Sequence, residues 1–267
     1  MDVLTKIVNH KEKEVAERRS LFPVKLLEQS IYFATPCMSF KKYITKEGKS
    51  GVIAEIKRKS PSRGDINPNV SVERTSIGYM QAGASALSIL TDSAFFGGSS
   101  EDLITARKFN FCPILRKDFI IDEYQLIEAK SIGADAVLLI AAILEPKKLK
   151  VLASVARSLQ LEVLLEVHDE QELNSNMDSM PDVIGINNRN LKTFEVDTEV
   201  SRKLVKKIPD GIIRISESGI DSPETASELR VLGFDGFLIG ESFMKASRPE
   251  YAALEFIKEL RKLESKK

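Results

Sequence analysis

Eight short apolar runs recur along the chain from residue 52 onward, and they constrain the fold more than any other feature of the sequence. They are rich in Val, Ile and Leu and show little alternation of apolar and polar residues, which is typical of strands buried on both faces. The runs cover residues 52–56, 86–90, 113–115, 136–140, 163–165, 183–186, 212–215 and 237–239. Segments with the apolar spacing of amphipathic helices lie between them. Eight strand–helix units in series, each a right-handed crossover, predict a closed (β/α)8 TIM barrel.

The predicted helices carry clear start and end signals. Pro146 and Pro223 each stand at a first helical position, where proline is favoured because its missing N–H is not needed. Gly83, Gly133 and Gly233 each end a helix just before a strand, and glycine is the preferred residue at a left-handed helix end. A doubly wound open sheet uses the same units and is the alternative fold at this stage.

Residues 1–48 stand outside the eight units. Their pattern predicts two helices, over residues 3–18 and 24–34, followed by a connector that contains Pro36. We expect residues 1–48 to form a helical extension packed on the barrel and residues 49–267 to form the catalytic barrel, together making one structural domain. The extension either caps one end of the barrel or partly covers the mouth of its active site, and both arrangements fit the pattern.

Charge and hydropathy exclude several classes of partner. The 39 basic and 39 acidic side chains give zero net charge, whereas a nucleic-acid-binding surface needs a basic excess or stripe. No apolar run approaches the ~18 residues that cross a bilayer, and the N-terminus lacks the apolar core of a secretory signal. We therefore expect a cytoplasmic protein that contacts neither nucleic acid nor membrane.

The scarcity of histidine and cysteine narrows the chemistry further. Cys37 and Cys112 are the only cysteines, too few for a disulfide framework, and they fit a reducing compartment. His10 and His168 are the only histidines, and their separation argues against a multi-histidine metal site. Any acid–base chemistry must depend mainly on lysine and carboxylate groups.

Polar side chains follow most of the apolar runs, at the ends where an α/β barrel places its active site. They include Glu55, Lys57, Ser60, Arg116, Lys117, Asp118, Glu166, Asn187, Arg189, Glu217, Ser218 and Glu241. Each alone is more often a solvated charge or a local ion pair, such as Lys57 with Glu55 or Lys117 with Asp118. His168 is expected to be a bystander just beyond its strand. The concentration of these groups at one end of the predicted strands indicates a pocket.

Two short glycine-containing loops indicate what this pocket binds. Residues 216–220 follow the seventh run and residues 239–242 follow the eighth. Glycine lets backbone N–H groups approach a ligand closely, and phosphate sites in this fold lie after strands seven and eight. We therefore expect a small phosphorylated substrate. We expect the chain itself to be a monomer or a weak homo-oligomer.

Five segments resemble the indole-3-glycerol phosphate synthase family, in order along the chain. Residues 52–62, which read VIAEIKRKSPS, resemble the signature segment of that family and are its most specific match. The others are residues 115–119 (LRKDF), 165–167 (LEV), 184–191 (IGINNRNL) and 217–220 (ESGI). The similarity extends through essentially the whole chain, including the N-terminal extension, and corresponds to the monofunctional form of the enzyme.

The resemblance implies a reaction in tryptophan biosynthesis that uses no metal and no organic cofactor. In this reaction 1-(2-carboxyphenylamino)-1-deoxyribulose 5-phosphate becomes indole-3-glycerol phosphate, with release of carbon dioxide and water. Ring closure needs a proton donor to the ketone oxygen, decarboxylation restores the aromatic ring, and dehydration needs an acid–base pair.

The resemblance also implies roles for the catalytic residues. Lys117 is the general acid of ring closure, since a lysine of ordinary pKa is protonated at neutral pH. Glu166 serves as an acid–base group in the dehydration. Glu55 and Asn187 orient the reacting groups, and Glu55 also places a lysine. Lys57 binds the phosphate or a substrate oxygen and takes part in proton transfer.

The implied substrate-binding residues surround this catalytic set. Ser60 and Arg189 line the substrate site, while Phe96 and Phe119 form an apolar wall for the anthranilate ring. Backbone N–H groups for the phosphate come from Ser218, Gly219, Gly240 and Glu241. Glu241 stands where some members of the family carry serine. Because a carboxylate beside a phosphate is unfavourable, we expect its side chain to turn away.

Two other functions use the same barrel. A Schiff-base aldolase would use Lys117 or Lys57 as its nucleophile and would share the phosphate site, but it gives no reason for the segment at residues 52–62. A non-enzymatic barrel that binds a phosphorylated ligand does not require both Lys117 and Glu166.

Overall fold

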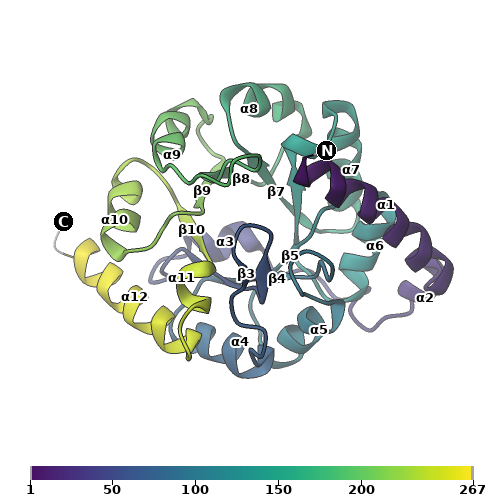
Figure 1. The fold of residues 1–267 in the computed structure, drawn as a ribbon, viewed down its shortest axis with the longest axis horizontal. Helices are drawn as coiled ribbons and strands as arrows, with labels where there is room; N and C mark the ends of the chain where they lie inside the picture. The colour runs from purple at the N-terminus through teal and green to yellow at the C-terminus, as the bar shows by residue number, and fades with distance from the viewer. Residues whose placement is uncertain (1, 266–267) are drawn as a thin grey trace.

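The barrel predicted from the apolar runs is present and closed in the computed structural model, which describes residues 2–265 (Figure 1). Eight parallel strands follow one another around it in chain order, and the last strand pairs with the first through Phe237 and Val52. The strands are β1 (Val52–Ile56), β4 (Ala86–Leu90), β5 (Ile114–Lys117), β6 (Ala136–Ile140), β7 (Glu162–Val167), β8 (Val183–Asn187), β9 (Ile213–Glu217) and β10 (Gly236–Ile239). Because β10 pairs with β1, the alternative of a doubly wound open sheet is wrong.

Several strands run further toward their carboxyl ends than the apolar runs that predicted them. Strands β5, β8 and β9 end at Lys117, Asn187 and Glu217, one or two residues beyond the predicted run. Strand β7 likewise includes Glu166. Backbone pairing continues through these positions, since Lys117 pairs with Leu90 and Asn187 pairs with Glu217. These polar residues therefore stand on the barrel wall and not on the loops.

Helices fill each connection between successive strands and form a ring around the barrel (Figure 1). These are α4 (Val72–Gln81), α5 (Ser100–Phe109), α6 (Glu123–Ser131), α7 (Pro146–Ser158), α8 (Glu170–Asn176), α9 (Glu199–Leu204) and α10 (Pro223–Val231), and α11 (Glu241–Met244) and α12 (Pro249–Glu264) follow the last strand. The starts predicted at Pro146 and Pro223 are confirmed. Side chains such as Ser71 and Ser99 accept a backbone N–H of the first turn, a donor that has no partner within the helix. None of the helices within residues 2–265 is both long enough and apolar enough to cross a bilayer.

The N-terminal extension differs in part from its predicted form. Helix α1 (Val3–Leu21) matches the first predicted helix, but α2 spans only Val24–Leu27. The helix expected over residues 24–34 is therefore wrong beyond its first turn. The chain continues there as separate turns, which the Ser30 hydroxyl fixes by donating to the carbonyl oxygen of Ser131.

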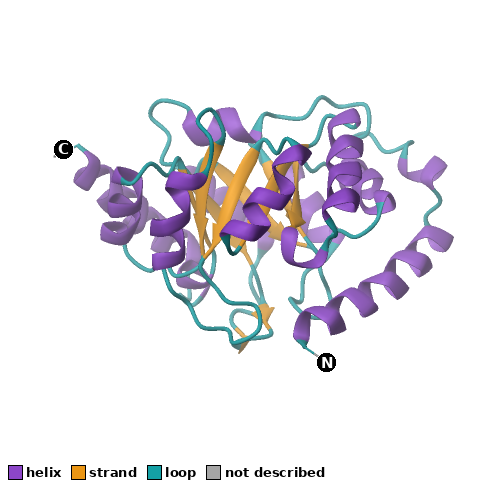
Figure 2. Ribbon diagram, turned by 90° about the horizontal axis from the view of Figure 1, so that it is seen from above, coloured by secondary structure: helices purple, strands orange, loops and turns teal. Residues whose placement is uncertain are grey.

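Opposite ends of the barrel receive different parts of the extension. A third helix, α3 (Phe40–Thr45), lies in the expected connector and is too short to show a helical period in the sequence. Its buried Ile44 packs against Gly236, the first residue of β10, and so closes the amino end of the barrel. The start of α1 lies at the other end of the barrel, the end that also carries the hairpin of β2 (Lys59–Ser60) and β3 (Gly64–Asp65) (Figure 2). The extension thus caps one end and reaches the mouth at the other.

A buried ion cluster ties α1 to the barrel. The Nζ atom of Lys11 lies 2.8 Å from Glu14, 2.9 Å from Asp92 and 3.0 Å from Asp118. Lys11 is only 1% exposed, and burial opposes its charge, but Asp118 and Asp92 outweigh burial and raise the pKa of Lys11. Since Asp118 directly follows Lys117, the cluster joins the extension to the end of β5.

Candidate active site

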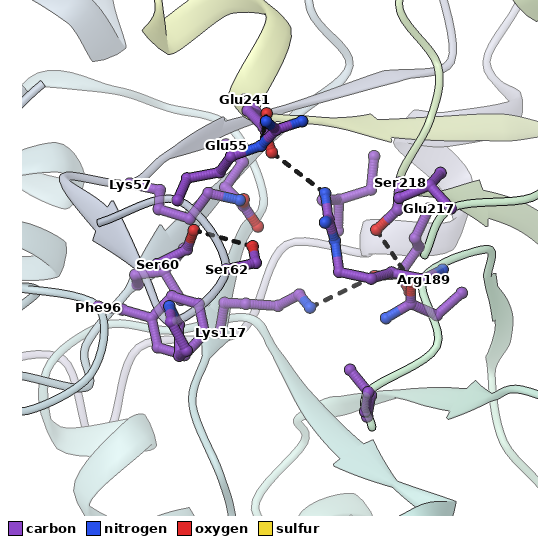
Figure 3. A pocket seen from close by; sticks show the side chains of 18 of the residues that line it. Glu55, Lys57, Ser60, Ser62, Phe96, Lys117, Arg189, Glu217, Ser218 and Glu241 are labelled. Atoms are coloured by element: carbon purple, nitrogen blue, oxygen red, sulfur yellow. Dashed lines mark hydrogen bonds and ion pairs between the residues drawn. The ribbon is translucent and has the colours of Figure 1, made fainter. Parts of the chain in front are cut away.

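A cavity of about 250 Å³ opens at the carboxyl ends of the strands, and every residue to which the resemblance assigns a role lines it. These residues are Glu55, Lys57, Ser60, Phe96, Lys117, Phe119, Glu166, Asn187, Arg189, Ser218, Gly219, Gly240 and Glu241. They are far apart in the sequence, and the closure of the barrel brings their side chains around one space (Figure 3). Arg116, one of the polar residues expected at the pocket, does not line it, because its guanidinium is buried against Asp118 and Glu128.

Lys117 reaches into the charged part of the cavity (Figure 3). Its Nζ lies 3.2 Å from Oε2 of Glu166 and 3.3 Å from Oε2 of Glu217. Burial opposes the charge of this ammonium group, but Glu217 and Glu166 outweigh burial and raise the pKa of Lys117 well above its ordinary value. Lys117 is therefore a cation at neutral pH. The expected local pair with Asp118 is wrong, because Asp118 pairs with Lys11 instead.

Glu166 divides its two oxygens between two basic groups. Oε2 faces Lys117, and Oε1 lies 3.5 Å from Nε2 of His168. Burial disfavours the ionised carboxylate, but Lys117 and His168 outweigh burial and hold the pKa of Glu166 below its ordinary value, with a further contribution from Asn187. The expectation that His168 is a bystander is wrong, because its ring lies against a predicted catalytic group.

Glu217 is one of the polar residues expected at the pocket, but the resemblance assigns it no role, and it lines the cavity beside Lys117. Burial raises the pKa of Glu217 to about 7, against the opposing effect of Lys117. Its Oε1 atom has no hydrogen-bond partner within residues 2–265. A β-carbon added at Gly185 of the neighbouring strand would collide with this oxygen, so glycine is needed there. Its place at the end of a predicted strand, like that of Glu166, is the sequence signal that puts it at the pocket.

Glu55 and Lys57 form the ion pair expected from their spacing. The Nζ atom of Lys57 lies 2.7 Å from Oε1 of Glu55. The two residues lie on either side of Ile56 in the sequence, so their side chains point the same way and line the same cavity. A β-carbon added at Gly240 would collide with Glu55, so the loop after β10 approaches this pair closely because it carries glycine there.

Asn187 fixes the loops that follow β8 and β9. Its Oδ1 accepts the main-chain N–H of Arg189 at 3.0 Å and the hydroxyl of Ser218 at 2.9 Å. Ser218 and Gly219 have φ angles of 66° and 72°, so two successive residues adopt the left-handed conformation. The chain therefore turns sharply directly after β9, beside the cavity.

Glu241 does not turn away from the site as expected. Its carboxylate lies 3.1 Å from Nη2 of Arg189, 3.1 Å from Nε of Arg63 and 2.8 Å from Nζ of Lys245. Burial opposes its ionisation, but Lys245 and Arg189 outweigh burial and lower the pKa of Glu241. The three cations make a carboxylate acceptable beside an anion site. Arg63 and Lys245 line the cavity too and are absent from the predicted set.

The apolar wall contains the two predicted phenylalanines and part of α1. The rings of Phe96 and Phe119 have centroids 5.8 Å apart and planes inclined by 39°. The start of α1 adds Val3, Leu4 and Ile7 to the lining, in agreement with the expectation that the extension partly covers the mouth.

The cavity therefore combines one ammonium group between two carboxylates, an apolar wall and two glycine-containing loops near cationic side chains. This set suits proton transfer on a bound aromatic anion. No group of three or more His, Cys, Asp or Glu side chains arranged to hold a metal ion occurs within residues 2–265.

Comparison with known proteins finds one family over nearly the whole chain. The family model described as indole-3-glycerol phosphate synthase matches residues 4–256. The indole-3-glycerol phosphate synthase of Bacteroides thetaiotaomicron is 48% identical over 96% of this chain and 98% of its own length. That of Caldanaerobacter subterraneus is 44% identical over 97% of this chain and 99% of its own length.

A solved structure with low sequence identity shares the fold alone. Thiamine phosphate pyrophosphorylase from Pyrococcus furiosus superposes with a TM-score of 0.61 over 84% of this chain and 99% of its own, at 17% identity. The family match and the near-full-length relatives are more specific than this likeness of fold. The chain belongs to the indole-3-glycerol phosphate synthase family, carboxy-lyases of tryptophan biosynthesis.

Proposed function

We propose that this cavity closes the indole ring of 1-(2-carboxyphenylamino)-1-deoxyribulose 5-phosphate with Lys117 as the general acid. The observation that carries the proposal is the position of Lys117 Nζ, 3.2 Å from Glu166 and 3.3 Å from Glu217. The two carboxylates favour the protonated amine. Lys117 therefore has a proton to give to the ketone oxygen as the aromatic carbon attacks the ketone carbon.

Glu166 and Glu217 serve the later steps. Loss of carbon dioxide first restores the aromatic ring. The hydroxyl group on the former ketone carbon then leaves as water, which requires one proton delivered to it and one proton removed from the new ring. Glu166, which Lys117 and His168 keep ionised, is the acceptor. Glu217, with a pKa raised by burial to about 7, is a carboxyl group that still carries a proton near neutrality and is the donor.

The remaining lining residues hold the substrate. Phe96 and Phe119 contact the anthranilate ring, and Ser60 and Arg189 bind its anionic groups, since a guanidinium fits a carboxylate or phosphate with two donors. Lys57, placed by Glu55, binds the phosphate or a substrate oxygen. Backbone N–H groups of Ser218, Gly219, Gly240 and Glu241 bind the phosphate.

The raised pKa of Lys117 argues against the aldolase alternative. A Schiff-base lysine must lose its proton to become a nucleophile, and its pKa is usually lowered for this purpose. The carboxylates around Lys117 raise its pKa instead. Borohydride reduction with a keto-sugar phosphate tests the point directly. We expect no covalent lysine adduct, and a stable adduct would favour the aldolase.

Turnover is measured by incubating the protein with the carboxyphenylamino substrate and following indole fluorescence. The chain contains no tryptophan, so the product signal has little protein background. Lys117→Ala should abolish turnover while substrate binding stays measurable by calorimetry. Near-normal turnover in this variant would contradict the proposed role of Lys117.

The proposal extends to the state of the protein in the cell. Cys37 and Cys112 are free thiols, which supports a reducing, cytoplasmic location. One chain supplies all the residues of the cavity, which supports a monomer or a weak homo-oligomer. The contacts of Lys11 and Ile44 with the barrel support one structural domain, made of the extension at residues 1–48 and the barrel at residues 49–267. Light scattering and a single unfolding transition are the tests.

A further inference from the structure

His168 connects Glu166 to Glu172, a carboxylate that does not line the cavity. Its Nδ1 lies 3.1 Å from Oε2 of Glu172, and its Nε2 lies 3.5 Å from Oε1 of Glu166. Glu166 directs its second oxygen to Lys117 at 3.2 Å. Glu172, His168, Glu166 and Lys117 therefore form a line of acidic and basic groups that leads from α8 into the cavity.

The start of α8 fixes the outer end of this line. The main-chain N–H of His168 donates to Oε2 of Glu172 at 2.8 Å, and the main-chain N–H of Glu172 donates to Oδ1 of Asp169 at 2.8 Å. Asp169 is the N-cap of the helix, and Glu172 lies in its first turn. The imidazole is thus held from behind by a capped helix, and its other nitrogen faces Glu166.

The Nε2 atom of His168 faces Glu166 and is otherwise unpaired among residues 2–265. Nε2 is buried and has no hydrogen-bond partner among residues 2–265. Buried polar atoms without a partner are rare because they lose their hydration without compensation. The ionic neighbour of Nε2 is Oε1 of Glu166, at 3.5 Å.

The surrounding charges favour the imidazolium form. Burial works against a positive charge on His168, but Glu172, Glu166 and Glu217 outweigh burial and raise its pKa. These carboxylates face the ring from α8, β7 and β9, and Lys117 of β5 lies beyond Glu166.

We propose that His168, held by Glu172, is a positioning residue that keeps Glu166 ionised and orients it for proton transfer. The inference rests on the acid–base role proposed for Glu166. In this arrangement His168 holds Oε1 of Glu166, so that Oε2 remains directed at Lys117 and the bound substrate. His168 itself does not line the cavity and does not touch the substrate.

Two substitutions separate orientation from charge. His168→Gln retains an N–H donor toward Glu166 without a charge, and His168→Leu retains neither. We expect kcat of His168→Leu to fall about 10- to 100-fold, as it does when outer partners of metal ligands are removed, with KM little changed. His168→Gln should recover part of this loss. In both variants the acidic limb of the kcat profile should move to higher pH, because loss of the cation lets the pKa of Glu166 rise.

His10 provides the matched control, since it is the second of only two histidines. It lies on α1, is 46% exposed at its side chain and is 3.9 Å from Glu14. His10→Gln should keep the kcat, the KM and the pH profile of the parent protein. It also leaves one imidazole signal in the proton NMR spectrum, which assigns His168.

The NMR titration of His168 tests the ion pairs without reference to activity. Glu172→Gln and Glu166→Gln should each lower the pH midpoint of the His168 signal, because each removes a negative charge beside the ring. A midpoint that is the same in Glu166→Gln and in the parent protein overturns the inference. So does an acidic limb that stays in place in His168→Gln.

The outcome for Glu166→Gln separates this inference from the proposed function. We expect its kcat to fall by at least about 100-fold, as for loss of a general acid or base. If it remains active, the role proposed for Glu166 fails, whatever the His168 variants do. If it is inactive while the His168 variants keep the parent pH profile, only the present inference fails. If His168→Leu does not fold, as judged by circular dichroism, His168→Gln and Glu172→Gln decide the question.

Discussion

Gly185 on β8 leaves the space that the carboxylate of Glu217 occupies on β9. A β-carbon added at residue 185 would collide with Oε1 of Glu217. It would also lie 3.1 Å from the side chain of Leu164 on β7, the strand on the other side of β8. Glycine is therefore needed at residue 185 because any side chain would collide with Glu217, and not because of its backbone conformation.

Gly185→Ala should displace Glu217 and lower kcat. We expect a loss of stability of about 1–3 kcal/mol, the usual effect of overpacking, measured by urea unfolding. A double-mutant cycle with Glu217→Ala provides the control. If the alanine acts through Glu217, the double variant should be no less active than Glu217→Ala alone. Additive losses of activity would show that Gly185 acts elsewhere.

The raised pKa of Glu217 predicts an unusual dependence of stability on pH. Burial raises this pKa to about 7, above the ordinary value of 4.5, so the folded state holds the proton more tightly than the unfolded state. The contribution of Glu217 to the free energy of unfolding therefore declines as the pH rises from 4.5 through 7, and it is least favourable above pH 7. Glu217→Gln should gain stability relative to the parent protein at pH 8 and gain less at pH 5. Urea titrations at the two pH values measure the difference, and an equal effect at both would contradict the raised pKa.

Glu241 should set the affinity of the cavity for anions. Glu241→Gln removes the negative charge that Arg63, Arg189 and Lys245 share. Inorganic phosphate should then inhibit turnover at about 2- to 5-fold lower concentration, in line with the strength of partly exposed ion pairs.

Arg63→Gln is the complementary variant to Glu241→Gln. It removes a cation from the same carboxylate, so phosphate should inhibit more weakly. A shift in the same direction in both variants would show that orientation of the side chains, and not local charge, governs anion binding.

Lys11→Met should destabilise the protein strongly. The substitution leaves Asp92 and Asp118 buried without their shared cation, and breaking a buried ion pair in this way costs about 3–5 kcal/mol. Thermal unfolding measures the loss. Lys13 is exposed on the same helix, so Lys13→Met should change Tm little. Similar effects in both variants would contradict the role of the buried cluster.

The sequence predicted the barrel well because the strands are buried on both faces. Runs such as residues 86–90 and 136–140 coincide with β4 and β6, since continuous burial selects continuous apolar residues. The carboxyl ends of several strands were predicted too early, at the positions of the polar cavity residues. Lys117 and Glu217 are polar, but their backbones still pair with neighbouring strands, which side-chain hydropathy does not reveal.

The position of the site was predictable from the polar residues at the strand ends, since Lys117, Glu166 and Asn187 line the cavity. The contacts between elements were not. Asp118 pairs with Lys11 on a distant helix, and Glu241 with Arg63 from another loop, so sequence neighbours were a poor guide to ion pairs. The region at residues 24–34 has helical apolar spacing but becomes separate turns, because Ser30 bonds to the barrel there. Tertiary contacts override local propensity in these cases.

The placement of Lys117, Glu166, Asn187 and Glu217 on strands has a consequence for redesign. Neighbouring strands hold these backbones by hydrogen bonds around a closed ring, whereas Arg189, Ser218 and Glu241 lie in loops or at a helix start. Exchanging the loops would thus change which anion is held while the proton-transferring groups keep their spacing. With the roles proposed above, the molecule separates reactivity from recognition, and laboratory evolution toward other aromatic substrates has the loops as its natural targets.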